Sequence, residues 1–302
     1  MGHDRNILMN LKWFDDRKEI LAWVAAGLCL LALTLMATFP YAALHLRLLA
    51  ELNRATGMEV RVADWTAGLP LGLEWRNVTL SKPDWTPIQL AFLQARVGIV
   101  KALGGELGLD VVGQLDEGTP TAGLARGTLT ASSFSLTGPV AVKGQLQQVD
   151  LSKVLRRYVS HGVLNGDFSH RVDLSQATAG MGKGNGTWKA EVKDLAVEQI
   201  PVGNGRTLSL AFTKVSAGLV CQDSVCDVTE LKGDGIDGSF TGEGKITLQR
   251  PMQNSQLAVA VTVVPGAGFA SKAATLGLPP LPPGTPMTVN ILGTLAQTRV
   301  TL

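Results

Sequence analysis

The chain has 302 residues, of which 17% are charged and 45% hydrophobic, and its formal net charge is +2. This apolar composition and the 34 glycines exclude a disordered chain and argue against a helical bundle. No run of basic residues is longer than Arg156–Arg157, so the basic stripe of a nucleic-acid binder is missing. The composition favours a glycine-punctuated, mainly β protein with one unusually apolar segment.

The apolar segment runs from Ile20 to Leu44 without a charged residue, which is long enough to cross a bilayer as a tilted helix. A cleaved signal peptide is the alternative, but the run is longer than the usual apolar region and Ala37-Thr38-Phe39 is a poor cleavage site. We predict a cytoplasmic segment over 1–19, a single transmembrane anchor over 20–44 and a periplasmic β-rich domain over 45–302.

Two cysteines indicate the compartment of the large domain. Cys221 and Cys226 bracket four residues between two strand-like runs, a spacing that lets a hairpin bring two thiols together. The alternatives are two free buried thiols or half of a metal site. We predict a Cys221–Cys226 disulfide, which requires an oxidising compartment outside the cytoplasm. The expected location is therefore the bacterial inner membrane, with the bulk of the chain in the periplasm.

The rest of the chain is expected to be mainly β. Residues 41–56 keep a helical stripe of leucines, and the period then changes to two, which is typical of half-buried antiparallel strands. Asp150 is placed to cap a helix over 151–159, and another short helix is expected over 271–276. Alternating runs occur at 58–62, 71–75, 78–80, 88–92, 168–174, 188–192, 246–248, 257–263 and 287–291.

Glycines recur at positions where strands are expected to open, and they suggest a loosely repetitive meander. They are Gly127, Gly144, Gly186, Gly244 and Gly293. The predicted fold class is thus a single transmembrane helix followed by an elongated, glycine-punctuated antiparallel sheet with a few short helices. A curved or groove-like sheet is one form that this pattern allows.

Motifs for catalysis are missing from the sequence. No nucleophile elbow, phosphate loop or zinc-protease pattern occurs. The glycine-rich segment 180–186 is better explained as a hairpin loop than as a nucleotide site, and 233–238 as a turn than as a calcium loop. His161 and His170 are the candidate bases, but His170 alternates with Phe168 and Val172, which favours a packed or pocket histidine. We predict a protein that is not an enzyme, with no cofactor and no metal.

Short segments in a particular order span nearly the whole chain. They are Phe39-Pro40, Thr56–Val60, Gly72–Leu80, Leu164–Phe168, Leu231–Gly235, Gly242–Leu248, Pro251, Ser255–Leu257, Leu292–Leu295 and Arg299–Leu302. Their order resembles the type II secretion system protein N (GspN) family and, more distantly, the AsmA-like envelope proteins. Many members have a proline where this chain has Thr298, a departure confined to the last strand.

The resemblance implies a single-pass inner-membrane component of the type II secretion apparatus, which exports folded proteins across the outer membrane. Its expected partners are the membrane and other secretion subunits, with phospholipid as a further candidate and no nucleic acid. The family has no assigned catalytic residues.

Two mechanisms remain open for the sheet. Free strand edges can pair with other subunits and make the domain a scaffold. Alternatively, an apolar sheet face forms a groove for acyl chains, as the AsmA-like resemblance implies, and Leu257, Val259, Val261 and Val263 line it. The same side chains can equally pack against a second sheet. We favour the scaffold because monomers rarely leave a large apolar surface uncovered. An open apolar trough would favour lipid, and clustered Ser, His and acidic groups would favour a hydrolase.

Overall fold

The computed structural model describes residues 22–27, 29–31, 33–34, 38–56, 58–68, 71–81, 87–98, 101, 104–115, 123–132, 138–173, 183–201, 207–249, 254–275 and 284–301. Two units are distinguished, with the boundary after Leu48. The first contains helical residues 22–27 and the beginning of α2 (Tyr41–Thr56). The second contains all of the described strands.

The described strands follow one another along the chain with only two further short helices between them. The helices are α4 (Leu151–Val154) and α5 (Ala267–Thr275). The strands are β1 (Glu59–Gly68), β2 (Gly72–Ser81), β3 (Ile88–Val97), β4 (Leu107–Gln114), β5 (Leu124–Ala131), β6 (Pro139–Asp150), β7 (Val159–Asp173), β8 (Lys183–Pro201), β9 (Thr207–Gln222), β10 (Val225–Gly235), β11 (Gly238–Thr247), β12 (Gln256–Pro265), β13 (Met287–Thr294) and β14 (Thr298–Thr301).

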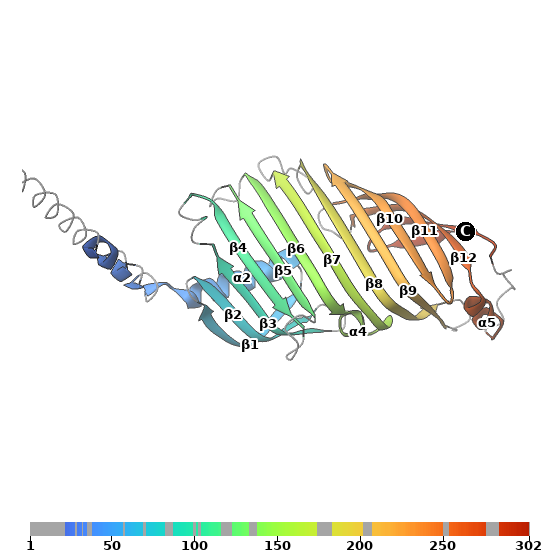
Figure 1. Ribbon diagram of the computed structural model, residues 1–302, viewed down its shortest axis with the longest axis horizontal. Helices are drawn as coiled ribbons and strands as arrows, with labels where there is room; N and C mark the ends of the chain where they lie inside the picture. The colour runs from blue at the N-terminus through green and yellow to red at the C-terminus, as the bar shows by residue number, and fades with distance from the viewer. Residues whose placement is uncertain are drawn as a thin grey trace, which may run out of the picture. The chain divides into compact units, whose positions relative to one another are not determined.

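These strands form a single fourteen-stranded antiparallel sheet whose spatial order is the chain order (Figure 1). Every neighbour is therefore the next strand in sequence, as in an extended meander. The prediction of a mainly β protein is confirmed. Because one sheet contains every described strand, no second sheet is available within the described ranges to cover either of its faces.

Several sequence predictions change in detail. The predicted runs 71–75 and 78–80 belong to one strand, β2, because its pairing with β1 continues on both sides of Asn77, whose φ is 49°.

The two short helices also differ from their predicted bounds. Asp150 does cap a helix, accepting a hydrogen bond from the Ser152 backbone N–H at 2.9 Å, but α4 ends at Val154. The predicted helix over 151–159 is too long because Val159 is recruited into β7. The second helix covers Ala267–Thr275 instead of 271–276.

The membrane anchor is only partly within the described residues. Positions 1–19, 20–21, 28, 32 and 35–37 lie outside them. Among the helices that the structure does describe, none has both the length and the apolar character needed to span a bilayer.

A buried ion pair fastens α5 to the sheet. The Asp237 side chain is fully buried, and its Oδ2 accepts hydrogen bonds from Lys272 Nζ at 2.5 Å and from the Ala211 backbone N–H at 2.6 Å. Lys272 also donates to the Ser209 carbonyl oxygen at 3.1 Å. Since a buried carboxylate is costly unless it is paired, this arrangement fixes the helix against the β10–β11 turn and β9.

Candidate functional site

One face of the sheet is apolar across its whole width. Cross-strand partners in an antiparallel sheet project to the same side, so the register defines rows of side chains. One row crosses all of the described strands and contains only apolar residues and glycine. It runs Ala67, Leu73, Ala95, Val111, Gly127, Gly144, Phe168, Trp188, Leu219, Val228, Gly244, Val259, Ile291 and Val300.

A second row on the same face runs from β3 to β13. It consists of Val97, Leu109, Leu129, Val142, His170, Gly186, Cys221, Cys226, Ile246, Leu257 and Gly293. His170 is the one polar side chain in these two rows. We call the side of the sheet that carries both rows the apolar face.

The opposite side, the polar face, has a different composition. The row that lies between the two apolar rows consists mainly of charged and hydroxyl-bearing residues, with Val220, Ala258 and Leu292 as its apolar members. It runs Arg96, Asp110, Thr128, Lys143, Ser169, Thr187, Val220, Asp227, Lys245, Ala258, Leu292 and Arg299. The sheet is therefore amphipathic as a whole, since each strand contributes the same alternation in the same register.

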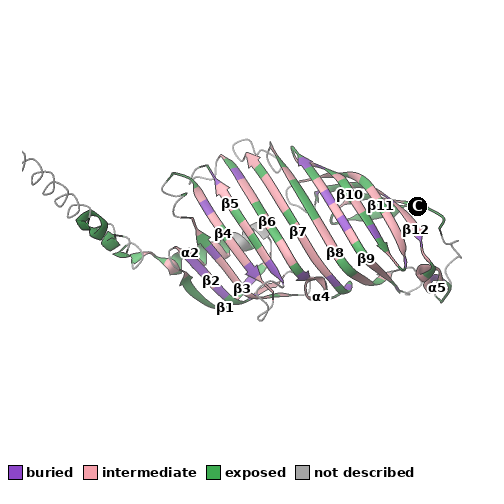
Figure 2. Ribbon diagram, viewed as in Figure 1, coloured by how far each residue is buried: buried purple, intermediate pink, exposed green. Residues whose placement is uncertain are grey.

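Burial shows that the apolar face is not sealed. Figure 2 shows buried residues as short bands between longer half-buried and exposed stretches. Val259 and Val261 are 8% and 9% exposed, but Trp188 on the same face is 42% exposed. The apolar face is thus closed at its β2 end, where Leu73 and Trp75 are 1% and 2% exposed, and open around Trp188.

The predicted groove residues all lie on this face. Leu257, Val259, Val261 and Val263 project from β12 toward the side that also carries their β13 partners Gly293, Ile291, Val289 and Met287. The structure thus gathers them with apolar residues of the adjoining strands, and the sequence alternation could not identify these partners.

The glycines within the rows make room for rings from neighbouring strands. A Cβ at Gly144 would overlap the Phe168 ring, and a Cβ at Gly186 would overlap the His170 ring. These glycines lie inside strands and do not open them, contrary to the sequence prediction, and the same holds for Gly127, Gly244 and Gly293. The Phe168 ring also stacks on Trp188, with 4.9 Å between ring centroids. Aromatic rings lying over glycines of the neighbouring strand are a known device for fixing strand register.

An apolar pocket of about 340 Å³ opens on this face near its middle. Val142, Phe168, His170, Trp188, Leu219, Cys221, Cys226, Ile246 and Leu248 line it. Cys221 and Cys226 are joined by a disulfide bond at the end of the β9–β10 hairpin, and both are buried. The predicted cysteine pair therefore contributes to the wall of the pocket.

His170 is the exceptional group in this pocket. Burial lowers the pKa of its imidazole and so favours the neutral form of the ring. Its Nδ1 is buried and has no hydrogen-bond partner. The other candidate base, His161, is exposed near the beginning of β7. The structure does not bring the two histidines together.

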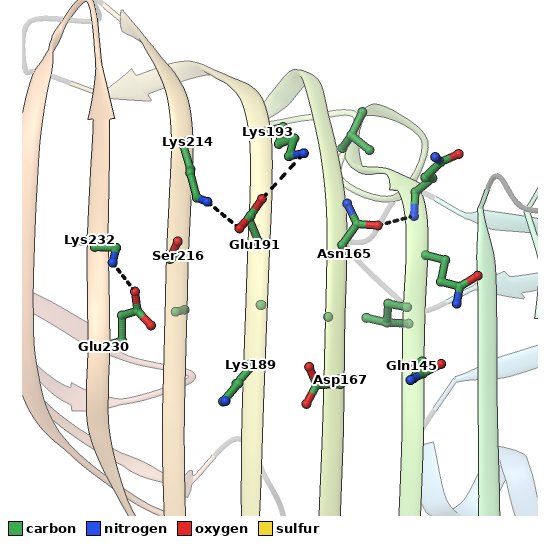
Figure 3. A pocket seen from close by; sticks show the side chains of 17 residues that line it. Gln145, Asn165, Asp167, Lys189, Glu191, Lys193, Lys214, Ser216, Glu230 and Lys232 are labelled. Atoms are coloured by element: carbon green, nitrogen blue, oxygen red, sulfur yellow. Dashed lines mark hydrogen bonds and ion pairs between the residues drawn. The ribbon is translucent and has the colours of Figure 1, made fainter.

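The polar face carries an open hollow of about 1050 Å³, whose charged side chains come mainly from β7 to β10 (Figure 3). Glu191 pairs with Lys214 at 2.6 Å, and this hydrogen bond lowers the pKa of the Glu191 carboxyl. Glu230 pairs with Lys232 at 2.5 Å with the same effect on its pKa. The hollow is larger than the apolar pocket, but five of its seven charged side chains are engaged in ion pairs, which here are exposed and therefore weakly stabilising.

The sheet curls away from this charged hollow. Seen from the polar side in Figure 3, the strands from both ends of the sheet lie behind the central strands. The apolar face is therefore on the inner side of the curvature.

Other candidate chemistry receives no geometric support. Within the part of the chain that the structure describes, no group of three His, Cys, Asp or Glu side chains is arranged to hold a metal ion. Of the glycine-rich segment 180–186, residues 183–186 belong to β8 and the remainder lies outside the described residues. The segment 233–238 contains the β10–β11 turn at Ile236 and Asp237, as predicted.

The fold and the site define a class: a single antiparallel sheet with one polar face and one apolar face that no second sheet of the described strands covers. A scan against protein-family models gives no match for this chain, and searches of the curated proteins and of the solved structures likewise give none. The functional argument therefore rests on the two faces of the sheet.

Proposed function

We propose that the chain binds the acyl chains of lipids along its apolar face and acts in lipid transfer or envelope biogenesis, as an AsmA-like protein. The observation that carries the proposal is the apolar row that crosses every described strand. In this proposal, 20–44 anchors the chain in the bacterial inner membrane and 45–302 lies in the periplasm. The protein is proposed to have no enzymatic activity.

The energetics favour an apolar ligand on this face. Covering apolar surface is worth roughly 25 cal/mol per Å², and each methylene of an acyl chain contributes about 0.8 kcal/mol when it leaves water. Large exposed apolar patches on soluble domains are usually binding sites. The reason for favouring a scaffold was the expectation of a covering layer, and the described strands provide none.

The length of the face suits a lipid path more than a single small ligand. Thirteen strand spacings of about 4.8 Å give the complete row a length of roughly 60 Å. This is about twice the thickness of the hydrocarbon core of a bilayer. Several acyl chains can therefore lie along the face in succession.

The test compares two neighbouring aliphatic residues on β13. Ile291 lies in the apolar row, whereas its neighbour Leu292 projects to the polar face and is 46% exposed. The full-length wild-type chain is expected to co-purify with phospholipid, measured by solvent extraction and mass spectrometry. Ile291→Glu should lower the bound lipid several-fold because it places a carboxylate among acyl chains, and Leu292→Glu should not.

Circular dichroism of both variants shows whether the sheet is intact. Lipid-free wild-type protein, or equal losses of lipid in two folded variants, would contradict the proposal.

A role in type II secretion is a second candidate function, and the outer strands of the sheet favour it. Every residue of β14 is exposed, and β14 pairs on one side only, with β13. An exposed strand edge is a template for pairing with another subunit. Deleting the gene is then expected to trap folded exoproteins in the periplasm, with release on complementation. Fractionation of medium and periplasm measures this, and unchanged secretion would exclude the role.

A further inference from the structure

His170 is a polar group in an otherwise apolar environment. Its partners in the row are Val142 on β6 and Gly186 on β8, and Phe168 and Trp188 line the same pocket. None of the other pocket residues carries a charge, and the indole N–H of Trp188 is the one other hydrogen-bonding group among their side chains apart from the disulfide sulfurs. Buried polar atoms normally have partners, so an imidazole at this position calls for an explanation.

The two ring nitrogens are in different situations. Nδ1 is closed off beside Gly186, where a Cβ would overlap it, and it has no hydrogen-bond partner. Orphaned buried N–H groups are rarer than orphaned acceptors, so the proton of the neutral ring belongs on Nε2. Nε2 is then the nitrogen that can meet a molecule in the pocket, and it is a hydrogen-bond donor.

We propose that this pocket is a discrete acyl-ester site, in which His170 Nε2–H donates a hydrogen bond to the ester carbonyl of a lipid while the adjoining acyl chain lies on the apolar face. The inference rests on the proposed function and names the chemical group that the site recognises. A wall of hydrocarbon with so few donors matches a ligand that has an ester acceptor at the end of a hydrocarbon chain.

The surroundings of the pocket discriminate against a charged group at this position. The pocket wall holds no lysine or arginine, so a phosphate or a free carboxylate would be desolvated without a counter-ion. The lipid headgroup must therefore lie outside the pocket. The pocket has a volume of about 340 Å³, which is at the lower end of the range for small-molecule sites and suits the ester region of a larger lipid.

The test uses two phosphatidylcholines with identical chain lengths, one ester-linked and one ether-linked, competing with a fluorescent phospholipid bound to the full-length chain. The ether lipid lacks the carbonyl and is otherwise closely similar. The wild type is expected to bind the ester lipid about five-fold more tightly, which is the effect of one neutral hydrogen bond. His170→Leu should lose this preference but still bind both lipids, and His170→Gln, which keeps a donor, should retain part of it.

His161→Leu is the matched control, because His161 lies on the same strand and is exposed. It should keep the wild-type preference. Equal binding of ester and ether lipids by the wild type would overturn the acyl-ester site while the proposed function stands. Failure of the wild type to bind either lipid would overturn both. If circular dichroism shows that His170→Leu does not fold, the comparison of ester and ether lipid binding by the wild type is the test of the acyl-ester site.

Discussion

Gly244→Ala is expected to lower the free energy of unfolding by about 3 kcal/mol, although it adds only one methyl group. Gly244 lies in the complete apolar row, between Val228 and Val259. An added Cβ would overlap the Ala258 carbonyl oxygen and would lie 2.6 Å from the Val259 Cα. Both are backbone atoms, so no side-chain rotation relieves the overlap and β11 must move away from β12. Urea unfolding followed by circular dichroism measures the loss.

The matched control is Gly127→Ala, which adds the same methyl group in the same row. There the closest atom to an added Cβ is the Lys143 carbonyl oxygen at 3.6 Å, an ordinary contact. Alanine at a compatible position loses less conformational entropy on folding than glycine, so this variant should be neutral or stabilised by about 0.5 kcal/mol. Equal losses in the two variants would show that the backbone approach at Gly244 is not the cause.

The double variant Cys221→Ala/Cys226→Ala is expected to lose about 2 kcal/mol of stability relative to the oxidised wild type. The loop that the bond closes is short, with a sequence separation of 5, so the value lies at the lower end for disulfides. The disulfide also closes a strained turn. Asp223 and Ser224 have φ values of 47° and 69°, and at the position of Ser224 glycine is the residue that adopts this conformation most readily.

Chemical denaturation with and without reductant measures this effect. The wild type should lose stability on reduction, and the double variant should not respond to the reductant. Cys29→Ala is the control, since Cys29 takes no part in the disulfide. A double variant as stable as the oxidised wild type would show that the hairpin is set by strand pairing alone.

Much of the local structure could be predicted from the sequence. The period of two identified β12 and β13 within three residues and the first halves of β1 and β3, and the helical stripe predicted α2 with its observed bounds of Tyr41–Thr56. The failures occur where the sheet competes with local preference. The stripe over 151–159 favours a helix, but its last residue, Val159, pairs with Val197 in the sheet, and the helix is cut to one turn.

The glycines were the least predictable part of the site. In a sequence, a glycine before an alternating run suggests the opening of a strand. Gly144 instead lies within β6, because the Phe168 ring of the next strand occupies the space above it. Gly144 and Phe168 become neighbours only through the register of the β6–β7 pairing, and the sequence around either residue does not reveal that register.

The sequence by itself determined that the strands are amphipathic, because alternation is a local property with a period of two residues. The tertiary structure decided how those strands combine. A shift of one residue in any pairing would turn a strand's apolar side chains to the opposite face, so a row that spans the sheet exists only through the register of every hairpin. It also decided that every described strand joins one sheet, so that no second sheet of described strands packs on the apolar face, and it placed His170 on that face.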